Sequence, residues 1–145
     1  FDNYKREMVA SDAGFYIGSL NDFPGLHSGY TISRIKNKGI LKLLEGEENR
    51  QAEWRFVLAY CEPTRDPVLF EGITKGNISV EEKGSDGYVF DSIFVPRYRG
   101  NKMTFAENIA LKKKIGARWI ACQDFLSWYS GGDNNERYER PHTVG

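Results

Sequence analysis

The chain has 145 residues, of which 40% are hydrophobic and 14% aromatic, enough for the core of one domain. Twenty Lys and Arg residues balance twenty Asp and Glu residues, so the formal net charge is zero. This balance argues against a broad nucleic-acid or membrane surface, although a local basic pocket for a phosphate ligand is compatible with it. We expect neither a signal peptide nor a membrane span, because no apolar run is long enough.

Cys61 and Cys122 are the only cysteines, and their spacing fits no zinc motif. We interpret both as small buried hydrophobic residues rather than as a disulfide. This interpretation favours a reducing, cytoplasmic setting.

The first predicted elements are a strand and a helix. Residues 7–20 have strand-like cores at Met8–Ala10 and Phe15–Ile17. A Pro-Gly turn follows. Residues 31–46 then carry apolar side chains at helical spacing, a pattern that Gly39 is expected to break in two.

Two longer strands follow. Alternating apolar residues predict strands over 53–61 and 68–82, joined as an antiparallel hairpin. A short buried strand is predicted at 93–95, where Pro96 ends the apolar run.

The last predicted element is a helix. Thr104 and Glu107 have the spacing of a capping box. Further on, one stripe of apolar residues recurs at steps of three and four, and we expect it to face the core. The stripe consists of Ile115, Trp119, Cys122, Leu126 and Tyr129. The polar residues 130–145 are expected to form a mobile tail outside a single domain of residues 1–129.

Asp12 is the first candidate for chemistry. It lies between two short apolar segments and is closely followed by Gly14, so it could coordinate Mg²⁺ or orient a water molecule. A bulge or turn aspartate would have the same local pattern.

The segment "GSDGYVFDSIFVP" (84–96) holds the second candidate. Tyr88 and Phe90 flank Val89 just before Asp91. Aromatic rings beside a carboxylate can stack on a purine while the carboxylate reads its edge, and a turn-forming Asp91 is the alternative.

The third candidate is "LKKKIGAR" (111–118), with four cations just before and at the start of the final predicted helix. Cations are unfavourable beside a helix N-terminus unless an anion lies there, so this segment could bind phosphate. A solvated, charged linker is the alternative.

No P-loop, nucleophile elbow, zinc-protease motif or dinucleotide fingerprint is present in the sequence. The only histidines are His27 and His142, so a nucleophilic triad is not expected. An enzyme built from this chain would use carboxylates, cations and a metal ion.

Five stretches in this order resemble the inosine triphosphate pyrophosphatase family, the noncanonical purine NTP pyrophosphatases. They are "ASDAGFYIGSLNDFPGLHSGY", "GILKLLEGEENRQAEW", "LFEGITKGNIS", "GSDGYVFDSIFVP" and "NKMTFAE". The similarity runs from about Val9 to Leu126.

The resemblance implies an α/β fold with a long mixed sheet flanked by helices and a cleft between two lobes. It also implies hydrolysis of ITP, XTP or dITP to the monophosphate and pyrophosphate with Mg²⁺, often by a homodimer. Asp12 matches the family's essential acidic position, a metal or water-activating carboxylate. Tyr88, Phe90 and Asp91 match the base-pocket segment. The implied partner is a purine nucleoside triphosphate, with no nucleic acid and no membrane.

The sequence also departs from the family pattern. The family's N-terminal Ser/Thr-x-Asn-x-x-Lys segment, which grips phosphate, has no counterpart here, so we expect a fold truncated at its N-terminus. Val89 replaces a glycine and Ser92 a proline.

The family's Lys-Asn…Ser-His-Arg pattern becomes "KKKIGAR". A one-residue gap aligns Lys112 and Arg118 with its Lys and Arg, whereas the ungapped alternative places Lys113 at the Lys position. The Ser-His pair is lost in both. The sequence thus predicts either a divergent pyrophosphatase or a degenerate, inactive relative that serves as a nucleotide-binding or assembly module.

Overall fold

The computed structural model describes residues 6–131. Most of the tail expected at 130–145, including His142, lies outside the described residues, so its predicted mobility stays a prediction. Within the described residues, no helix is long and apolar enough to cross a membrane.

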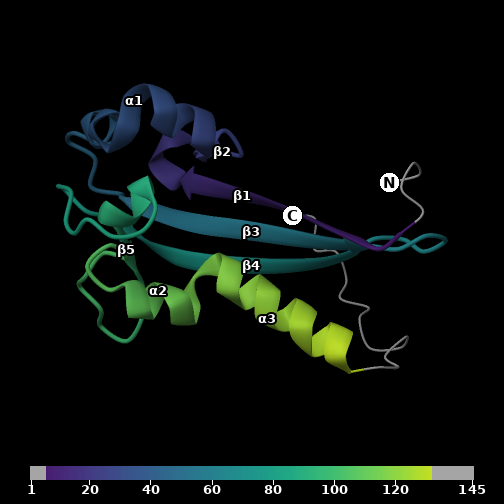
Figure 1. The fold of residues 1–145 in the computed structure, drawn as a ribbon. Helices are drawn as coiled ribbons and strands as arrows, with labels where there is room; N and C mark the ends of the chain where they lie inside the picture. The colour runs from purple at the N-terminus through teal and green to yellow at the C-terminus, as the bar shows by residue number, and fades with distance from the viewer. Residues whose placement is uncertain (1–5, 132–145) are drawn as a thin grey trace.

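A five-stranded sheet forms the centre of the molecule (Figure 1). Its order is β2-β1-β3-β4-β5, and each of these neighbouring pairs is antiparallel. The strands are β1 (Met8–Ile17), β2 (Phe23–Gly25), β3 (Gln51–Cys61), β4 (Val68–Ile78) and β5 (Phe94–Pro96). The predicted hairpin of two long strands is therefore confirmed as β3 and β4.

Strand β1 is continuous through the region where the sequence suggested two pieces. All ten of its residues pair with β3, from Met8 opposite Cys61 to Ile17 opposite Ala52. Neither Asp12 nor Gly14 interrupts the pairing. Asp12 is therefore a strand residue rather than a bulge or turn residue.

Three α-helices and two short 3₁₀ turns complete the described chain. The helices are α1 (Ser28–Leu43), α2 (Ile109–Ile115) and α3 (Ala117–Ser130), and the 3₁₀ turns are η1 (Gly18–Leu20) and η2 (Val89–Ser92). The predicted interruption of the first helix exists, but it lies at Lys36, where φ is 53°, and not at Gly39.

Two hydrophobic clusters pack against the same face of the sheet. The first joins Phe15 and Ile17 of β1 to Ile40 of α1 and Phe90 of η2. The second joins Phe56, Leu58, Tyr60 and Phe70 of β3 and β4 to Ala117 and Ala121 of α3. Trp54 packs against both clusters, so the core is continuous along this covered face.

The opposite face of the sheet carries the alternate side chains of the strands. Leu69 and Ile73 of β4 point to this open face and are 50% and 39% exposed. An antiparallel sheet with one covered face and one open face gives burial with a period of two, and exposed and buried residues alternate along β4 from Leu69 to Ile78.

The apolar stripe predicted on the last helix does not face the core as a unit. Trp119, Leu126 and Tyr129 are each about half exposed. Helix α3 instead turns Ala117 and Ala121 to the sheet, because Gly72 of β4 lies directly beneath it. A methyl group placed on Gly72 would lie 1.9 Å from the carbonyl oxygen of Ala117. This close approach leaves room only for small residues where α3 crosses Gly72, whereas Phe125 and Trp128 pack against Phe70 further along the helix.

Candidate functional site

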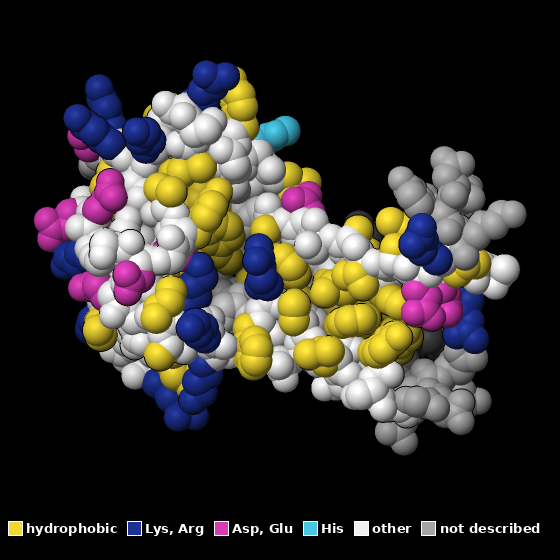
Figure 2. All heavy atoms as spheres, viewed as in Figure 1, with side chains coloured by type: hydrophobic (Ala, Val, Ile, Leu, Met, Phe, Trp, Pro, Cys, Tyr) yellow, Lys and Arg dark blue, Asp and Glu magenta, His cyan; other side chains and the backbone are white. Residues whose placement is uncertain are grey.

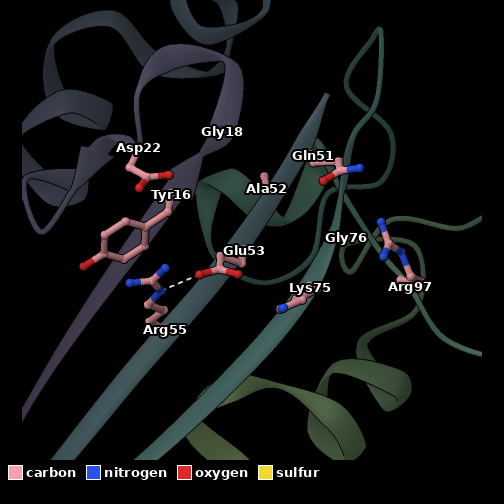
Figure 3. A pocket seen from close by; sticks show the side chains of 10 residues that line it. All are labelled: Tyr16, Gly18, Asp22, Gln51, Ala52, Glu53, Arg55, Lys75, Gly76 and Arg97. Carbon is pink, nitrogen blue, oxygen red and sulfur yellow. Dashed lines mark hydrogen bonds and ion pairs between the residues drawn. The ribbon is translucent and has the colours of Figure 1, made fainter. Parts of the chain in front are cut away.

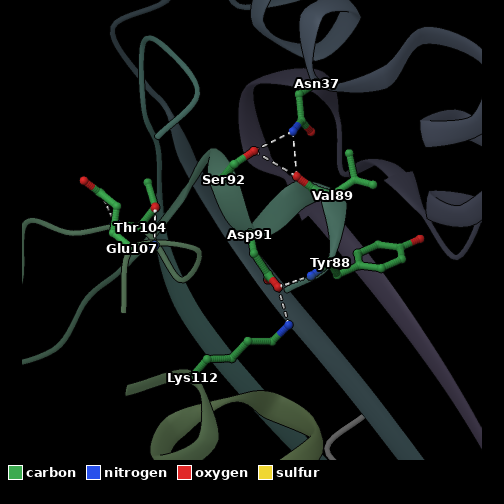
Figure 4. Close-up of polar contacts among 8 residues, drawn as sticks. All are labelled: Asn37, Tyr88, Val89, Asp91, Ser92, Thr104, Glu107 and Lys112. Atoms are coloured by element: carbon green, nitrogen blue, oxygen red, sulfur yellow. Dashed lines mark hydrogen bonds and ion pairs between the residues drawn. The ribbon is translucent and has the colours of Figure 1, made fainter. Parts of the chain in front are cut away.

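The segment around Asp91 folds as a 3₁₀ turn held by its own side chain (Figure 4). The Asp91 carboxylate accepts a hydrogen bond from the backbone N–H of Tyr88 through Oδ2. Gly87 precedes this turn with a φ of 84°, and a Cβ there would lie 2.3 Å from Asp91 Oδ2. A glycine is therefore required at position 87 both by the backbone conformation and by the space.

Asp91 is completely buried and forms an ion pair with Lys112 of α2 (Figure 4). The Lys112 side chain is 32% exposed, so its ammonium group connects the buried carboxylate to the surface. Oδ1 of Asp91 is buried and has no hydrogen-bond partner among the described residues. A buried carboxylate needs such a cation, because removal of its water is costly.

The aromatic residues of this segment divide between surface and core. Tyr88 is 45% exposed, and its ring lies edge-on to Trp54 with the centroids 6.0 Å apart. Phe90 has no exposed surface and stacks on Phe15 at 4.7 Å. Tyr88 therefore has surface to offer a ligand, whereas Phe90 and Asp91 are supporting residues in this arrangement.

Asn37 is part of the site, although the sequence did not single it out. It is 1% exposed, and its Nδ2 donates to the Val89 carbonyl at 2.6 Å and to Ser92 Oγ at 2.8 Å. Asn37 directly follows the kink in α1 at Lys36. The kink thus directs a buried amide toward η2, and Ser92 supplies an acceptor that a proline would lack.

A reciprocal capping box supports the loop beside η2. Thr104 N–H donates to Glu107 Oε2 at 2.8 Å, and Glu107 N–H donates to Thr104 Oγ1 at 3.2 Å. This confirms the predicted capping pair. The box closes a turn before the next helix, because α2 starts only at Ile109, with Asn108 as its own cap.

The lysines of residues 111–118 lie at the end of one helix and not at the start of another. Lys112, Lys113 and Lys114 occupy the last turn of α2, where the helix dipole favours cations. The argument that these cations need an anion to offset the dipole is therefore wrong for the three lysines, whereas Arg118 does lie in the first turn of α3. The structure brings Lys112 to Asp91 and leaves Lys113 exposed. Arg118 is exposed at the start of α3, with its guanidinium 5.2 Å from the Phe56 ring.

Asp12 lies apart from these residues. It pairs with Val57, so its side chain points to the open face, whereas Phe56, Arg118 and Tyr88 belong to the covered side. Asp12 is exposed, and its Oδ1 accepts the N–H of Ala13 at 2.8 Å. The structure therefore brings Tyr88, Asp91 and Lys112 together and does not bring Asp12 into contact with them.

A pocket of about 250 Å³ lies on the open face, at the end of the sheet near β2 (Figure 3). Arg55 lines this pocket, forms an ion pair with Glu53 and stacks 4.4 Å from the Tyr16 ring. Burial by itself lowers the pKa of Arg55, but the hydrogen bond and charge of Glu53 outweigh it, so the pKa is raised overall. Lys75 and Arg97 also line this pocket.

No cluster of three or more His, Cys, Asp or Glu side chains suited to a metal occurs in the part of the chain that the structure describes. Mg²⁺ commonly uses only one or two protein carboxylates, with phosphate oxygens and water completing its shell. The exposed carboxylate of Asp12 fits that mode of binding, since its Oδ2 has no partner among the described residues. Cys61 and Cys122 are both free, as the sequence predicted, but each is only partly buried, whereas the sequence indicated buried residues.

Comparison with known proteins identifies a matching family and several similar proteins. The family model described as Ham1 family matches residues 1–128. A dITP/XTP pyrophosphatase of Methanopyrus kandleri is 46% identical over 125 residues, which cover 86% of this chain and 65% of that protein. A dITP/XTP pyrophosphatase of Methanosarcina mazei is 40% identical over 126 residues, which cover 86% and 66%.

Solved structures show the same fold. The Ham1 protein of Staphylococcus aureus superposes with a TM-score of 0.78 at 22% identity, covering 91% of this chain and 71% of that one. A dITP/XTP pyrophosphatase of Mycobacterium abscessus gives a TM-score of 0.71 at 28% identity, covering 86% and 66%. These matches confirm the α/β fold with helices flanking an elongated sheet.

The chain spans just under two thirds of the length of these two archaeal relatives. The family match nevertheless covers most of this chain, and it agrees with the five motifs found in the sequence. The chain therefore belongs to the Ham1 family, the inosine triphosphate pyrophosphatase family that its motifs indicated.

Proposed function

We propose that this chain forms the nucleotide-binding part of a pyrophosphatase for noncanonical purine nucleoside triphosphates. The substrates would be ITP, XTP and dITP, and the products the monophosphate and pyrophosphate. The observation that carries this proposal is the Asp91–Lys112 pair beside the exposed Tyr88. It is supported by relatives named dITP/XTP pyrophosphatases at 46% and 40% identity.

Base recognition follows from the chemistry of these side chains. The Tyr88 ring can stack on a purine, because it is 45% exposed and braced by Trp54. The Lys112 ammonium is a donor that Asp91 holds in place. Hypoxanthine and xanthine present a 6-oxo acceptor to such a donor. Adenine presents an amino group, which would leave the donor unpaired.

Asp12 would hold Mg²⁺ together with phosphate oxygens. Bound Mg²⁺ would neutralise the developing charge on the triphosphate. Asp12 itself would position the attacking water, and Arg118 would contact the phosphates. Since Asp12 lies on the open face and Lys112 on the covered side, the two residues would contact different parts of the nucleotide. We also propose that the chain forms a homodimer. A reducing, cytoplasmic location is proposed because both cysteines are free.

The experiment compares nucleotide binding with turnover. Calorimetry with ITP, XTP, dITP, ATP and GTP measures affinity, and pyrophosphate release with Mg²⁺ measures turnover. We expect the three noncanonical nucleotides to bind more tightly than ATP. Equal affinity for ITP and ATP would contradict the proposed base recognition.

Two substitutions assign the roles. Tyr88→Ala is expected to weaken ITP binding about tenfold, because a base–aromatic stack contributes about 1–3 kcal/mol. Val89→Ala is the matched control, since Val89 is 47% exposed beside it and has no proposed role.

Asp12→Asn is expected to abolish pyrophosphate release while ITP binding without metal is retained. Full activity of Asp12→Asn would exclude its catalytic role.

The sequence also allowed a degenerate, inactive relative, and the same experiments distinguish it from an active enzyme. Selective ITP binding without pyrophosphate release by the unmodified chain would favour a nucleotide-binding module. The observation that favours this second function is that Asp12 and Lys112 lie on opposite sides of the sheet.

A further inference from the structure

Positive charge is concentrated in one segment of this neutral chain. Residues 97–118 contain seven Lys and Arg residues and a single acidic residue, Glu107. The rest of the chain contains thirteen basic and nineteen acidic residues. The segment therefore carries a formal charge of +6, which the remaining residues balance with −6.

Six of these seven cations are exposed: Arg97, Arg99, Lys102, Lys113, Lys114 and Arg118. Arg97 lines the open-face pocket and Arg118 belongs to the proposed site, so we refer to the remaining four, Arg99, Lys102, Lys113 and Lys114, as the basic surface. Figure 2 shows Lys and Arg side chains gathered over α2 and below it. Among the described residues, none of these four cations forms a salt bridge with a carboxylate.

The basic surface is not explained by folding alone. The dipole of α2 accounts for Lys113 and Lys114, which lie in its last turn. It does not account for Arg99 and Lys102, which lie in the loop before the helix. Arg99 and Lys114 lie 5.3 and 5.8 Å from the ring of Tyr98, so like charges approach the same aromatic ring. The Tyr98 ring attracts both cations, but no carboxylate among the described residues offsets their mutual repulsion, which suggests that they serve a ligand.

The basic surface adjoins the candidate site. Lys113 and Lys114 directly follow Lys112, and two residues advance a helix by only about 3 Å. Electrostatic attraction acts over about 8 Å at physiological ionic strength. An anion that approaches Lys112 therefore passes within the field of the neighbouring lysines.

We propose that the basic surface attracts the triphosphate of an incoming nucleotide and accelerates its arrival at Tyr88 and Lys112. The inference rests on the proposed function, because it takes a nucleoside triphosphate as the ligand. The exposed cations act on the encounter and not on the bound complex. They therefore raise the association rate constant and leave the dissociation rate constant unchanged.

The test is stopped-flow binding of fluorescently labelled ITP, with EDTA present to prevent turnover. The unmodified chain is compared with Lys113→Gln/Lys114→Gln and with Arg99→Gln/Lys102→Gln. The second pair lies outside any helix, so its result does not depend on the α2 dipole. We expect each pair to lower the association rate constant about three- to tenfold at 50 mM NaCl. The difference is expected to vanish at 500 mM NaCl.

The matched control removes the same charge at the far end of the sheet. Arg6 and Arg65 lie beside the β3–β4 turn, about 20 Å from Thr74, whose side chain bonds to the last residue of α2. Arg6→Gln/Arg65→Gln is expected to keep the association rate constant within about twofold, because screening isolates it from the site. An equal loss in this control would show an effect of net charge and overturn the proposal.

The remaining outcomes are also decisive. A change confined to the dissociation rate constant would overturn the proposal by making these cations part of the bound complex. Single-stranded oligothymidylate that binds the basic surface more tightly than ITP would identify a nucleic-acid surface instead. Absence of any ITP binding would contradict the proposed function itself. Binding with a salt-independent association rate would contradict only this inference.

Discussion

Lys112 is in contact with Asp91, and this contact determines what a substitution at either residue does. Asp91 has no exposed surface, whereas Lys112 is about one third exposed. Loss of the lysine leaves a buried carboxylate without a cation, which costs more than the pair itself contributes. Its neighbour Lys113 has no carboxylate partner among the described residues and is exposed. The two lysines are therefore a matched pair for experiment.

We expect Lys112→Met to lower the free energy of unfolding by about 2 kcal/mol, a value reduced from that of a fully buried pair by the exposure of Lys112. Lys113→Met should change it by no more than about 0.5 kcal/mol. Urea denaturation at pH 7 measures both. Equal effects of the two substitutions would show that the Asp91–Lys112 pair does not hold η2 against α2.

Tyr60 is expected to make the stability of the folded chain depend on pH in the alkaline range. It is 6% exposed, and burial, together with the Glu7 carboxylate, raises its pKa from 10.0 to about 12. The raised pKa means that the folded state retains the proton more strongly than the unfolded state. The resulting stability is present below pH 10 and is lost as the pH rises through 12.

The check compares urea midpoints of the unmodified chain and Tyr60→Phe at pH 8, 10 and 11.5. The unmodified chain should lose more stability than the variant between pH 10 and 11.5. Parallel losses in both would exclude Tyr60 as the titrating group.

At the scale of elements, the contact between β4 and α3 depends on a missing side chain. Gly72 lies under the carbonyl of Ala117, where a Cβ would approach to 1.9 Å. The atom it meets belongs to the backbone, so relief requires the whole helix to shift. The predicted stripe on α3 was wrong for the same reason. Small residues must face Gly72, and this turns Trp119 and Leu126 outward.

We expect Gly72→Ala to lower the free energy of unfolding by about 3 kcal/mol through overpacking. Gly29→Ala is the control, because no atom lies within 4 Å of the added methyl group and Gly29 is in helix α1. Alanine is the better helix former, so this change should be neutral or stabilising by up to about 1 kcal/mol. Denaturation midpoints measure both, and a neutral Gly72→Ala would refute the close contact.

At the scale of the whole molecule, the charges cancel in number but not in position. The formal net charge is zero and the isoelectric point is near 6.9, while residues 97–118 carry +6. A neutral molecule with separated charge has little repulsion to keep copies apart at pH 7. The positive region of one copy can also attract the negative remainder of another.

We therefore expect the chain to self-associate at pH 7 in 10 mM NaCl and to dissociate in 300 mM NaCl, where charges are screened. Dynamic light scattering measures the hydrodynamic radius under both conditions. Association through the exposed apolar side chains of α3 would not weaken with salt. A radius that stays constant or grows with added salt would thus contradict the electrostatic explanation.

Several features could be predicted because they depend on neighbours in the chain. Alternating apolar residues predicted the β3–β4 hairpin, whose strands are joined by a short turn. The capping pair Thr104 and Glu107 is three residues apart and forms as expected. The helix break was expected at Gly39 but occurs at Lys36, where packing of Asn37 against η2 overrides local preference.

The sequence by itself determined the family, because five motifs in a fixed order survive in it, and it indicated the strands and helices that carry them. Only the tertiary structure decided how the site is arranged. Lys112 meets Asp91 across 21 positions, and Asn37 meets Ser92 across 55. Local patterns describe one element at a time, whereas these contacts arise when packing places separate elements together. The same packing turned Phe90 and Asp91 inward and set Asp12 on the open face of the sheet.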